Sequence, residues 1–133
     1  KRYPCIVWIC GGGWMRMDKS AHLSYLSTLA HQGFVVCSVE YRTSNEGCYP
    51  MQIEDVKAAI RYLKAHADRY RIDKEHFGAM GESAGGFLTC MAALDHDKAR
   101  DVGEYLEESS SIQAACPWYP PTNLSTFKYK DAE

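Results

Sequence analysis

Two continuous apolar runs near the start of the chain restrict its fold more than any other feature. Residues 3–10 read YPCIVWIC and residues 33–39 read GFVVCSV. Unbroken runs rich in Ile and Val are typical of strands buried on both faces of a parallel sheet. The segment between them has Asp18 and Ser20 as candidate caps and Gly33 at its end, which predicts a helix over residues 18–33. Its apolar face consists of Leu23, Leu26, Leu29 and Ala30.

The alternation of strand and helix patterns continues along the rest of the chain. Residues 51–70 predict a long helix, residues 76–80 (HFGAM) a short third strand, residues 83–94 a second apolar-faced helix and residues 111–118 (SIQAACPW) a fourth strand. This order predicts an α/β fold, a parallel β-sheet core of about four strands with flanking helices and right-handed crossovers. With no interior linker or repeat, we expect a single domain over residues 1–133. The apolar stripe of the long helix consists of Ile53, Val56, Ile60, Leu63 and Ala67.

Charge and hydropathy exclude several classes of partner. The chain has 15 Lys and Arg against 17 Asp and Glu, with no long block of either sign, so we expect no nucleic-acid partner. Its first apolar run has only about seven positions before glycines interrupt it, too few for a membrane span. We recognise no signal peptide, which favours the cytoplasm and leaves localisation open.

Six cysteines and five histidines raise the question of disulfides and metals. Most of the cysteines lie in strand-like or helix-like runs, where a thiol packs as a small apolar group, so we expect reduced, structural cysteines. No paired CxxC spacing occurs and the histidines are scattered, so we expect no metal site and no cofactor. The cysteines in such runs are Cys5, Cys10, Cys37, Cys90 and Cys116.

A serine motif follows the third predicted strand. Residues 81–85 read GESAG and fit the pattern G-x-S-x-G. In this pattern a tight strand-to-helix turn requires small neighbours and exposes the serine hydroxyl at the top of the sheet. The helix that follows has free N–H groups and a positive dipole end, which can face an oxyanion. The alternative is a glycine-rich turn with a capping serine, but the flanking elements and Gly86 favour a nucleophile elbow at Ser83.

Three glycines, Gly11–Gly13, follow the first predicted strand. Glycines at this position let backbone N–H groups face a bound substrate with no side chain in the way. A phosphate-binding loop is the alternative, but the segment CGGGWMRMDK contains neither G-x-G-x-x-G nor the Lys-Ser/Thr ending of a P-loop. We therefore interpret the segment as an oxyanion loop.

With these motifs in place, the chain resembles the esterase/lipase branch of the α/β-hydrolase superfamily, above all its feruloyl-esterase-like and hormone-sensitive-lipase-like carboxylesterases. The resemblance covers nearly the whole chain and corresponds to the N-terminal and central part of that fold, so it implies a partial α/β-hydrolase domain. The matching segments, in order, read CGGGW, VEYRTSNE, YPMQIEDVKAAIRYLKAHADRYRID, FGAMGESAGG and AACPWYPPTNL.

The resemblance implies a serine hydrolase that acts on small-molecule carboxylic esters. Ser83 would be the nucleophile that forms an acyl-enzyme. The backbone N–H groups of Gly12, Gly13 and Ala84 would form the oxyanion hole. Trp14 would line the acyl or alcohol pocket, with a buried aromatic wedge as an equal alternative.

Other matched positions have supporting roles. Glu40, Tyr41 and Arg42 match the family's strand-end motif, and we expect them to brace loops beneath the site instead of contacting substrate. We expect Glu54 and Asp55 to be solvated or to pair with Arg42 or another neighbour.

The chain departs from the family's pattern at five matched positions, which bear on loop geometry. Cys10 stands where the family has a histidine that helps to hold the oxyanion loop, and Met17 replaces a glycine. Pro117 and Asn123 replace aspartates, and Pro120 replaces a glycine. Pro117 lacks a ladder donor, so we expect it at a strand end or on an edge strand.

A general base is missing from the pattern. Ser83 needs a histidine oriented by an acid, and in this fold both follow the serine along the chain. Only His96 follows, at the far end of the predicted helix and roughly 20 Å away at helical rise. Beyond the fourth predicted strand the only acids are Asp131 and Glu133. We therefore expect the triad acid and base to be absent and the isolated chain to have little turnover. The remaining histidines are His22, His31 and His66 in predicted helices and His76 at the start of the third strand.

Two functional hypotheses stay open. The chain is either a piece of a longer or two-chain hydrolase, or a truncated scaffold that binds acyl ligands or a protein partner. Peptidases and thioesterases use the same core and stay open as well. Because the predicted strands form a sheet centre with unpaired edges, we expect a homo-oligomer or a complementing chain at those edges.

Overall fold

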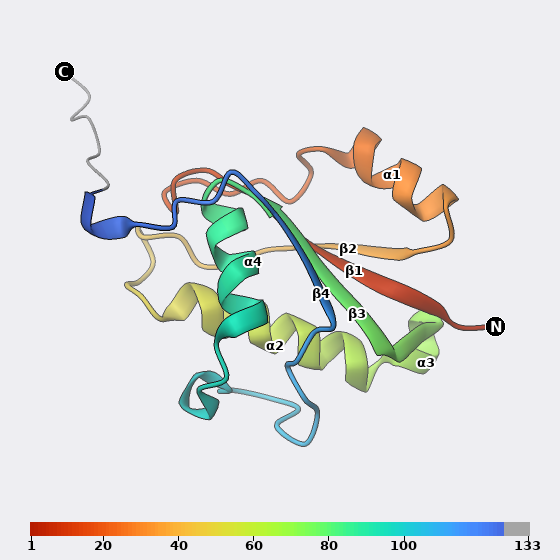
Figure 1. Cartoon of the computed structure of the whole chain (residues 1–133). Coiled ribbons are helices and arrows are strands. Elements are labelled where there is room, and N and C mark those ends of the chain that lie inside the picture. The colour runs from red at the N-terminus through yellow and green to blue at the C-terminus, as the bar shows by residue number, and fades with distance from the viewer. Residues whose placement is uncertain (127–133) are drawn as a thin grey trace.

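A parallel four-stranded sheet forms the centre of the structure, with strand order β2-β1-β3-β4 and helices on both faces (Figure 1). The computed structural model describes residues 1–126. The sheet confirms the α/β fold that the alternating sequence pattern predicts. Its elements in chain order are β1 (Tyr3–Ile9), α1 (Leu23–His31), β2 (Val35–Val39), α2 (Met51–Ala65), α3 (Ala67–Tyr70), β3 (Ile72–Glu82), α4 (Ala84–Leu94), η1 (Lys98–Arg100), β4 (Ala114–Trp118) and η2 (Leu124–Thr126).

Strand β1 is buried on both faces, which explains its unbroken apolar run. On one face Val7 and Ile9 pack into the core formed with α2 and α4. On the other face Trp8 packs against Leu26 of α1. At the carboxyl end of the sheet Ile9 lies in register with Val39 of β2 and Gly81 of β3. The loops that follow β1 and β3 therefore emerge at the same edge.

Helix α2 confirms the predicted apolar stripe, with one correction to its length. Ile53, Val56 and Ile60 are fully buried against the sheet. The predicted helix over residues 51–70 is interrupted at His66, whose backbone (φ −104, ψ 21) leaves the helical region. The interruption lets the chain turn into α3 and then into β3, which begins at Ile72.

Helix α1 begins later than the sequence predicts. Asp18 and Ser20 do not cap it, because Asp18 Oδ1 accepts hydrogen bonds from the N–H and hydroxyl of Ser20 and closes a separate turn. The residue before the helix is His22, in a left-handed conformation and without a side-chain cap. The buried stripe is also narrower than predicted, since only Leu26 is buried and Leu23 is 56% exposed.

Strand β3 is longer and strand β4 shorter than predicted. Ile72 already pairs with Tyr3, and the next pair is Phe77 with Cys5. The polar residues 73–76 lie between these two pairs, where the register is irregular. Strand β4 begins only at Ala114. Pro117 lies on this outer strand opposite Gly81, as expected for a residue without a ladder donor. Within residues 1–126, β2 and β4 each pair with one neighbour.

All six cysteines are free. Cys5 and Cys10 are buried, as expected for structural thiols, and burial raises the pKa of Cys5 to about 12. The expectation is wrong for Cys116, which is exposed because β4 is an outer strand. In the described part of the chain, no helix has the length and apolar character to cross a membrane.

Candidate active site

Ser83 occupies a sharp turn between β3 and α4. Its backbone has φ 53 and ψ −119, a conformation that residues other than glycine rarely adopt and that costs about 1–3 kcal/mol. Two hydrogen bonds hold the turn: Ser83 N–H donates to the Trp118 carbonyl at 3.0 Å, and Phe87 N–H donates to the Ser83 carbonyl at 3.0 Å. Strand β4 and the first turn of α4 thus keep the half-buried serine at the carboxyl edge of the sheet.

The glycines of the GESAG segment are required by close packing. A Cβ atom at Gly85 would lie 2.0 Å from the Ile9 carbonyl oxygen, and one at Gly81 would lie 2.5 Å from the same atom. The N-terminal turn of α4 therefore packs directly against the end of β1. Ala84 begins this helix, so its N–H has no acceptor within the helix.

The glycine loop passes against the serine. A Cβ atom at Gly11 would lie 3.1 Å from Ser83 Cβ, so the two segments are in contact. Gly12 has φ 135, and its carbonyl accepts hydrogen bonds from Met15 and Arg16 N–H, both at 3.1 Å. The structure thus brings the predicted oxyanion loop and the predicted elbow to one edge.

Two side chains anchor the start of this loop. The Tyr41 hydroxyl donates to the Cys10 carbonyl at 2.7 Å, and burial raises the pKa of that hydroxyl. Cys10 Sγ accepts a hydrogen bond from Asp18 N–H at 3.4 Å. Burial raises the pKa of the Cys10 thiol, although the Asp18 N–H acts in the opposite direction. Cys10 therefore contacts the loop from the position where the resembled family has histidine.

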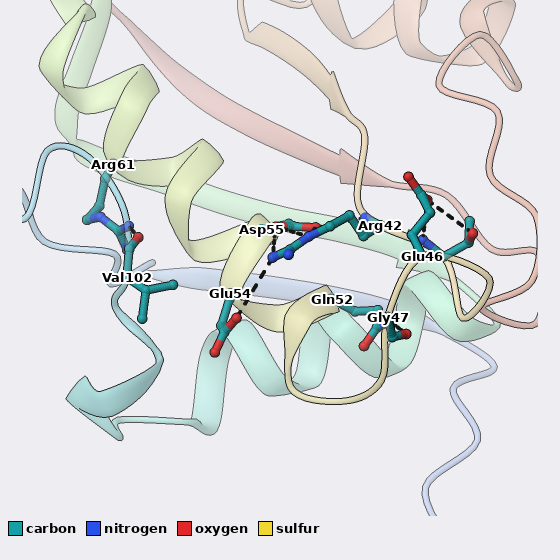
Figure 2. Close-up of polar contacts among 9 residues, drawn as sticks. Arg42, Glu46, Gly47, Gln52, Glu54, Asp55, Arg61 and Val102 are labelled. Atoms are coloured by element: carbon teal, nitrogen blue, oxygen red, sulfur yellow. Dashed lines mark hydrogen bonds and ion pairs between the residues drawn. The ribbon is translucent and has the colours of Figure 1, made fainter.

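Arg42 braces the segment that follows β2, as the sequence predicts. Its guanidinium and Asp55 form a two-pronged ion pair, with Nη2 to Oδ1 at 2.7 Å and Nε to Oδ2 at 2.9 Å (Figure 2). Arg42 N–H also donates to Asp55 Oδ2 at 2.8 Å, and Glu54 lies 3.8 Å from the guanidinium. The Asp55 carboxylate raises the pKa of Arg42. The hydrogen bonds of the pair connect the loop after β2 to the start of α2. Glu40 lies apart from this pair and bonds Lys19 at 2.7 Å.

Glu82 connects several segments at the edge, and sequence reasoning assigned it no role. Its Oε1 accepts Gly11 N–H at 3.3 Å and lies 3.4 Å from Nε2 of His22. Its Oε2 accepts the Tyr119 hydroxyl at 3.2 Å. Glu82 fills the variable position before the serine, so the motif itself contains no signal for these contacts.

Trp14 packs beside the elbow. Its ring meets Phe87 edge to face, with centroids 5.6 Å apart. This contact fits the wedge alternative, and a role in substrate binding stays a prediction.

A pocket of about 550 Å³ adjoins the site. Its lining includes Gly11, Arg16, Asp18 and Glu82.

The histidines do not complete a triad within the described residues. His96 follows the C-terminal end of α4, whereas Ser83 precedes its N-terminal end. His22 is the residue before α1, and its ring packs edge to face on Trp8 and faces Glu82. No histidine among residues 1–126 hydrogen-bonds the Ser83 hydroxyl. Asp131 and Glu133 lie outside the described residues. Among residues 1–126, no group of three or more His, Cys, Asp or Glu side chains is arranged to hold a metal ion.

Comparisons with known proteins find esterases among the relatives of this chain. The BD-FAE family model matches residues 1–133. The probable carboxylic ester hydrolase LipM of Mycobacterium tuberculosis is 36% identical over 118 residues, which cover 87% of this chain and 27% of LipM. Esterase LipC of the same organism is 32% identical over 121 residues, covering 90% of this chain and 30% of LipC.

Solved esterase structures share the fold. A butyrate-bound structure of Thermogutta terrifontis esterase 2 superposes with a TM-score of 0.83 at 28% identity, covering 98% of this chain and 47% of that enzyme. A truncated carbohydrate esterase from gut microbiota gives a TM-score of 0.81 at 34% identity, covering 90% of this chain and 47% of the other.

The fold and these relatives place the chain in the esterase branch of the α/β-hydrolases, and its homologues are carboxylic ester hydrolases. Within that branch, the chain belongs to the BD-FAE family. It spans about 30% of the length of the curated relatives that it matches, 27% of LipM and 30% of LipC.

Proposed function

We propose that this chain supplies the nucleophile and the oxyanion loop of a serine esterase that cleaves small carboxylic esters. The observation that carries the proposal is the position of Ser83, in a left-handed turn between β3 and α4 with the glycine loop against it. The relatives support ester hydrolysis because they are esterases.

The proposed reaction has two halves. Ser83 Oγ attacks the carbonyl carbon of the ester while a base takes its proton. The N–H groups of Gly12, Gly13 and Ala84 stabilise the resulting oxyanion. The bond to the alcohol oxygen then breaks, and the alcohol leaves with the proton held by the base. Water next attacks the acyl carbon while the base takes a proton from it. The bond to Ser83 Oγ then breaks, Oγ takes back the proton from the base, and the carboxylic acid is released.

The base and its orienting acid lie outside this chain in the proposal. His22 approaches Glu82 at 3.4 Å, and no hydrogen bond joins it to the serine hydroxyl. His96 is at the opposite end of α4. The chain would accordingly be one part of a longer or two-chain hydrolase.

Short acyl groups are the substrate class that we favour. Among the structural neighbours, Thermogutta terrifontis esterase 2 has been solved with propionate and with butyrate bound. Esters of short carboxylic acids are therefore the appropriate first probes.

A non-catalytic function is the second candidate. It is favoured by the lack of a histidine bonded to Ser83 among the described residues and by the singly paired outer strands of the sheet. In that case the same edge would bind an acyl ligand, or the sheet edges would bind a protein partner.

The test is hydrolysis of p-nitrophenyl butyrate by the chain and by the product of its complete reading frame. We expect the chain alone to show little turnover, and the complete product to lose about a thousandfold or more of its rate in Ser83→Ala. Ser27→Ala, an exposed serine on α1, is the matched control and should keep full activity.

Three outcomes would contradict parts of the proposal. Activity of the complete product that survives Ser83→Ala would exclude Ser83 as nucleophile. Substantial turnover by the chain alone that disappears in Ser83→Ala would place a base within it. An inactive complete product would favour the binding scaffold.

A further inference from the structure

We infer that Glu82 is a positioning residue for the oxyanion loop, a role that rests on the proposed function. Its carboxylate joins the loop after β1, the residue before α1 and the segment after β4 at the edge where Ser83 stands. Gly11, His22 and Tyr119 are its partners, at 3.3, 3.4 and 3.2 Å. Glu82 acts on the loop through Gly11, so it is not itself a catalytic residue.

The glycine loop needs an anchor of this kind. Its residues 11–13 carry no side chains, and the ladder of β1 with its neighbours ends at Ile9. The φ values of Gly12 and Gly13, 135 and 62, turn the loop away from the strand direction. Oxyanion donors act only when they are held within about 0.5 Å of the productive position. A hydrogen bond to Gly11, directly before the proposed donors, restricts where their N–H groups lie.

The hydrogen bond between Gly11 and Glu82 also separates Gly11 from the N–H groups that are proposed to bind the oxyanion. Gly11 N–H donates to Glu82 and so is occupied by the protein. The stabilisation of an oxyanion is then left to N–H groups further along the loop and to the start of α4. Gly12, Gly13 and Ala84 are in those positions.

The rest of the edge holds the Glu82 carboxylate in place. The side chain is 21% exposed, and its second oxygen accepts the Tyr119 hydroxyl. The residue before Tyr119, Trp118, accepts the Ser83 N–H. Ser83 and Glu82 are therefore held by two consecutive residues, the last residue of β4 and the residue that follows it. A carboxylate just before the N-terminus of α4 also interacts favourably with the helix dipole.

The test follows Gly11 and Ser83 separately. Amide hydrogen exchange at Gly11 of this chain reports the anchor. The rate at which a fluorophosphonate probe labels Ser83 in the product of the complete reading frame, where the proposed base is present, reports the oxyanion hole. We expect Glu82→Ala to raise Gly11 exchange about tenfold and to slow labelling about tenfold to a hundredfold, since misplaced groups cost up to about a hundredfold. Exchange at Val7 and the midpoint of urea unfolding should stay near wild type.

The conservative variant separates positioning from general structure. Glu82→Gln keeps an oxygen that can accept Gly11 N–H, so it should restore both exchange and labelling to within about threefold of wild type. Tyr119→Phe removes one partner from an exposed side chain and should raise Gly11 exchange to a smaller degree. Because this variant changes only a surface hydroxyl, it serves as the test if Glu82→Ala fails to fold.

Several results would overturn the inference. One is unchanged Gly11 exchange in a folded Glu82→Ala chain, or in Tyr119→Phe if the alanine variant does not fold. Another is faster exchange with unchanged labelling, and a third is a Glu82→Gln chain as impaired as Glu82→Ala. If the wild-type product of the complete reading frame is not labelled at Ser83 at all, the proposed function fails, and Gly11 exchange alone decides whether Glu82 holds the loop.

Discussion

At the scale of single residues, the elbow depends on the absence of side chains. A Cβ atom at Gly85 would lie only 2.0 Å from the Ile9 carbonyl oxygen and 2.7 Å from the Cys10 carbonyl oxygen. Both obstacles are backbone atoms of the segment that leads into the glycine loop, and backbone cannot rotate away as a side chain can. Any residue larger than glycine must therefore move α4 or the end of β1.

Gly85→Ala tests this requirement. We expect a loss of about 3 kcal/mol in unfolding free energy, because overpacking forces the backbone to shift. Urea unfolding followed by circular dichroism measures it. The matched control is Gly78→Ala in β3, where an added Cβ atom meets only ordinary contacts, 3.6 Å from the Ala114 carbonyl oxygen. That variant should be as stable as wild type or up to about 1 kcal/mol more stable. Equal effects of the two substitutions would contradict the packing argument.

At the scale of elements, the segment between α4 and β4 is held on α2 by a buried arginine. Arg61 is fully buried and pairs with Asp101 at 2.8 Å. It also donates to the Glu104 carbonyl at 3.2 Å. A further bond goes to the Val102 carbonyl, which Figure 2 shows beside Arg61. Because a buried guanidinium is costly unless its donors are used, these contacts fix the path of this segment.

Arg61→Met tests the contribution of this arginine. The substitution keeps much of the side-chain volume but leaves a carboxylate and two carbonyls without their donor, so we expect a loss of about 3–5 kcal/mol. Arg69→Met, at an exposed arginine on α3, should change the unfolding free energy by less than about 0.5 kcal/mol. A loss below about 1 kcal/mol for Arg61→Met would show that water replaces the guanidinium without cost.

At the scale of the whole molecule, the sheet is open at both sides within the described residues. Strands β2 and β4 each have a single neighbour. On β4, residues 114–116 are exposed. Unpaired strand edges are templates for pairing with another chain, so the expectation of self-association or of a complementing chain stays a prediction.

Light scattering coupled to size exclusion tests that prediction. We expect the apparent mass of the chain to rise with protein concentration in the presence of reductant, which removes any contribution from the exposed Cys116. Ala115→Lys places a charge on β4 and should reduce the association. Ser24→Lys, on the exposed surface of α1, adds the same charge away from the edges and should leave association unchanged. A chain that stays monomeric at every concentration would reject pairing through these edges.

The accuracy of the sequence predictions varies with the range of the interactions involved. The apolar run of β1 and the stripe of α2 were predicted correctly because burial requires apolar residues at regular short spacings along the chain. The start of α1 was predicted wrongly because Asp18 has a local partner in Ser20, which competes with capping. The polar half of β3 was missed because its residues have no apolar alternation and lie between the pairs Ile72–Tyr3 and Phe77–Cys5.

The candidate site divides in the same way. Ser83 and the glycines of its motif are visible in the sequence because a tight turn needs particular residues at fixed short spacings. Glu82 was missed because its partner Gly11 is 71 residues away along the chain. Sequence alone thus determined the α/β class, the positions of the GESAG turn and the glycine loop, and the esterase resemblance. Only the tertiary structure decided that the loop touches Ser83 and that its Gly11 N–H bonds Glu82, because parallel strands bring distant loops to one edge.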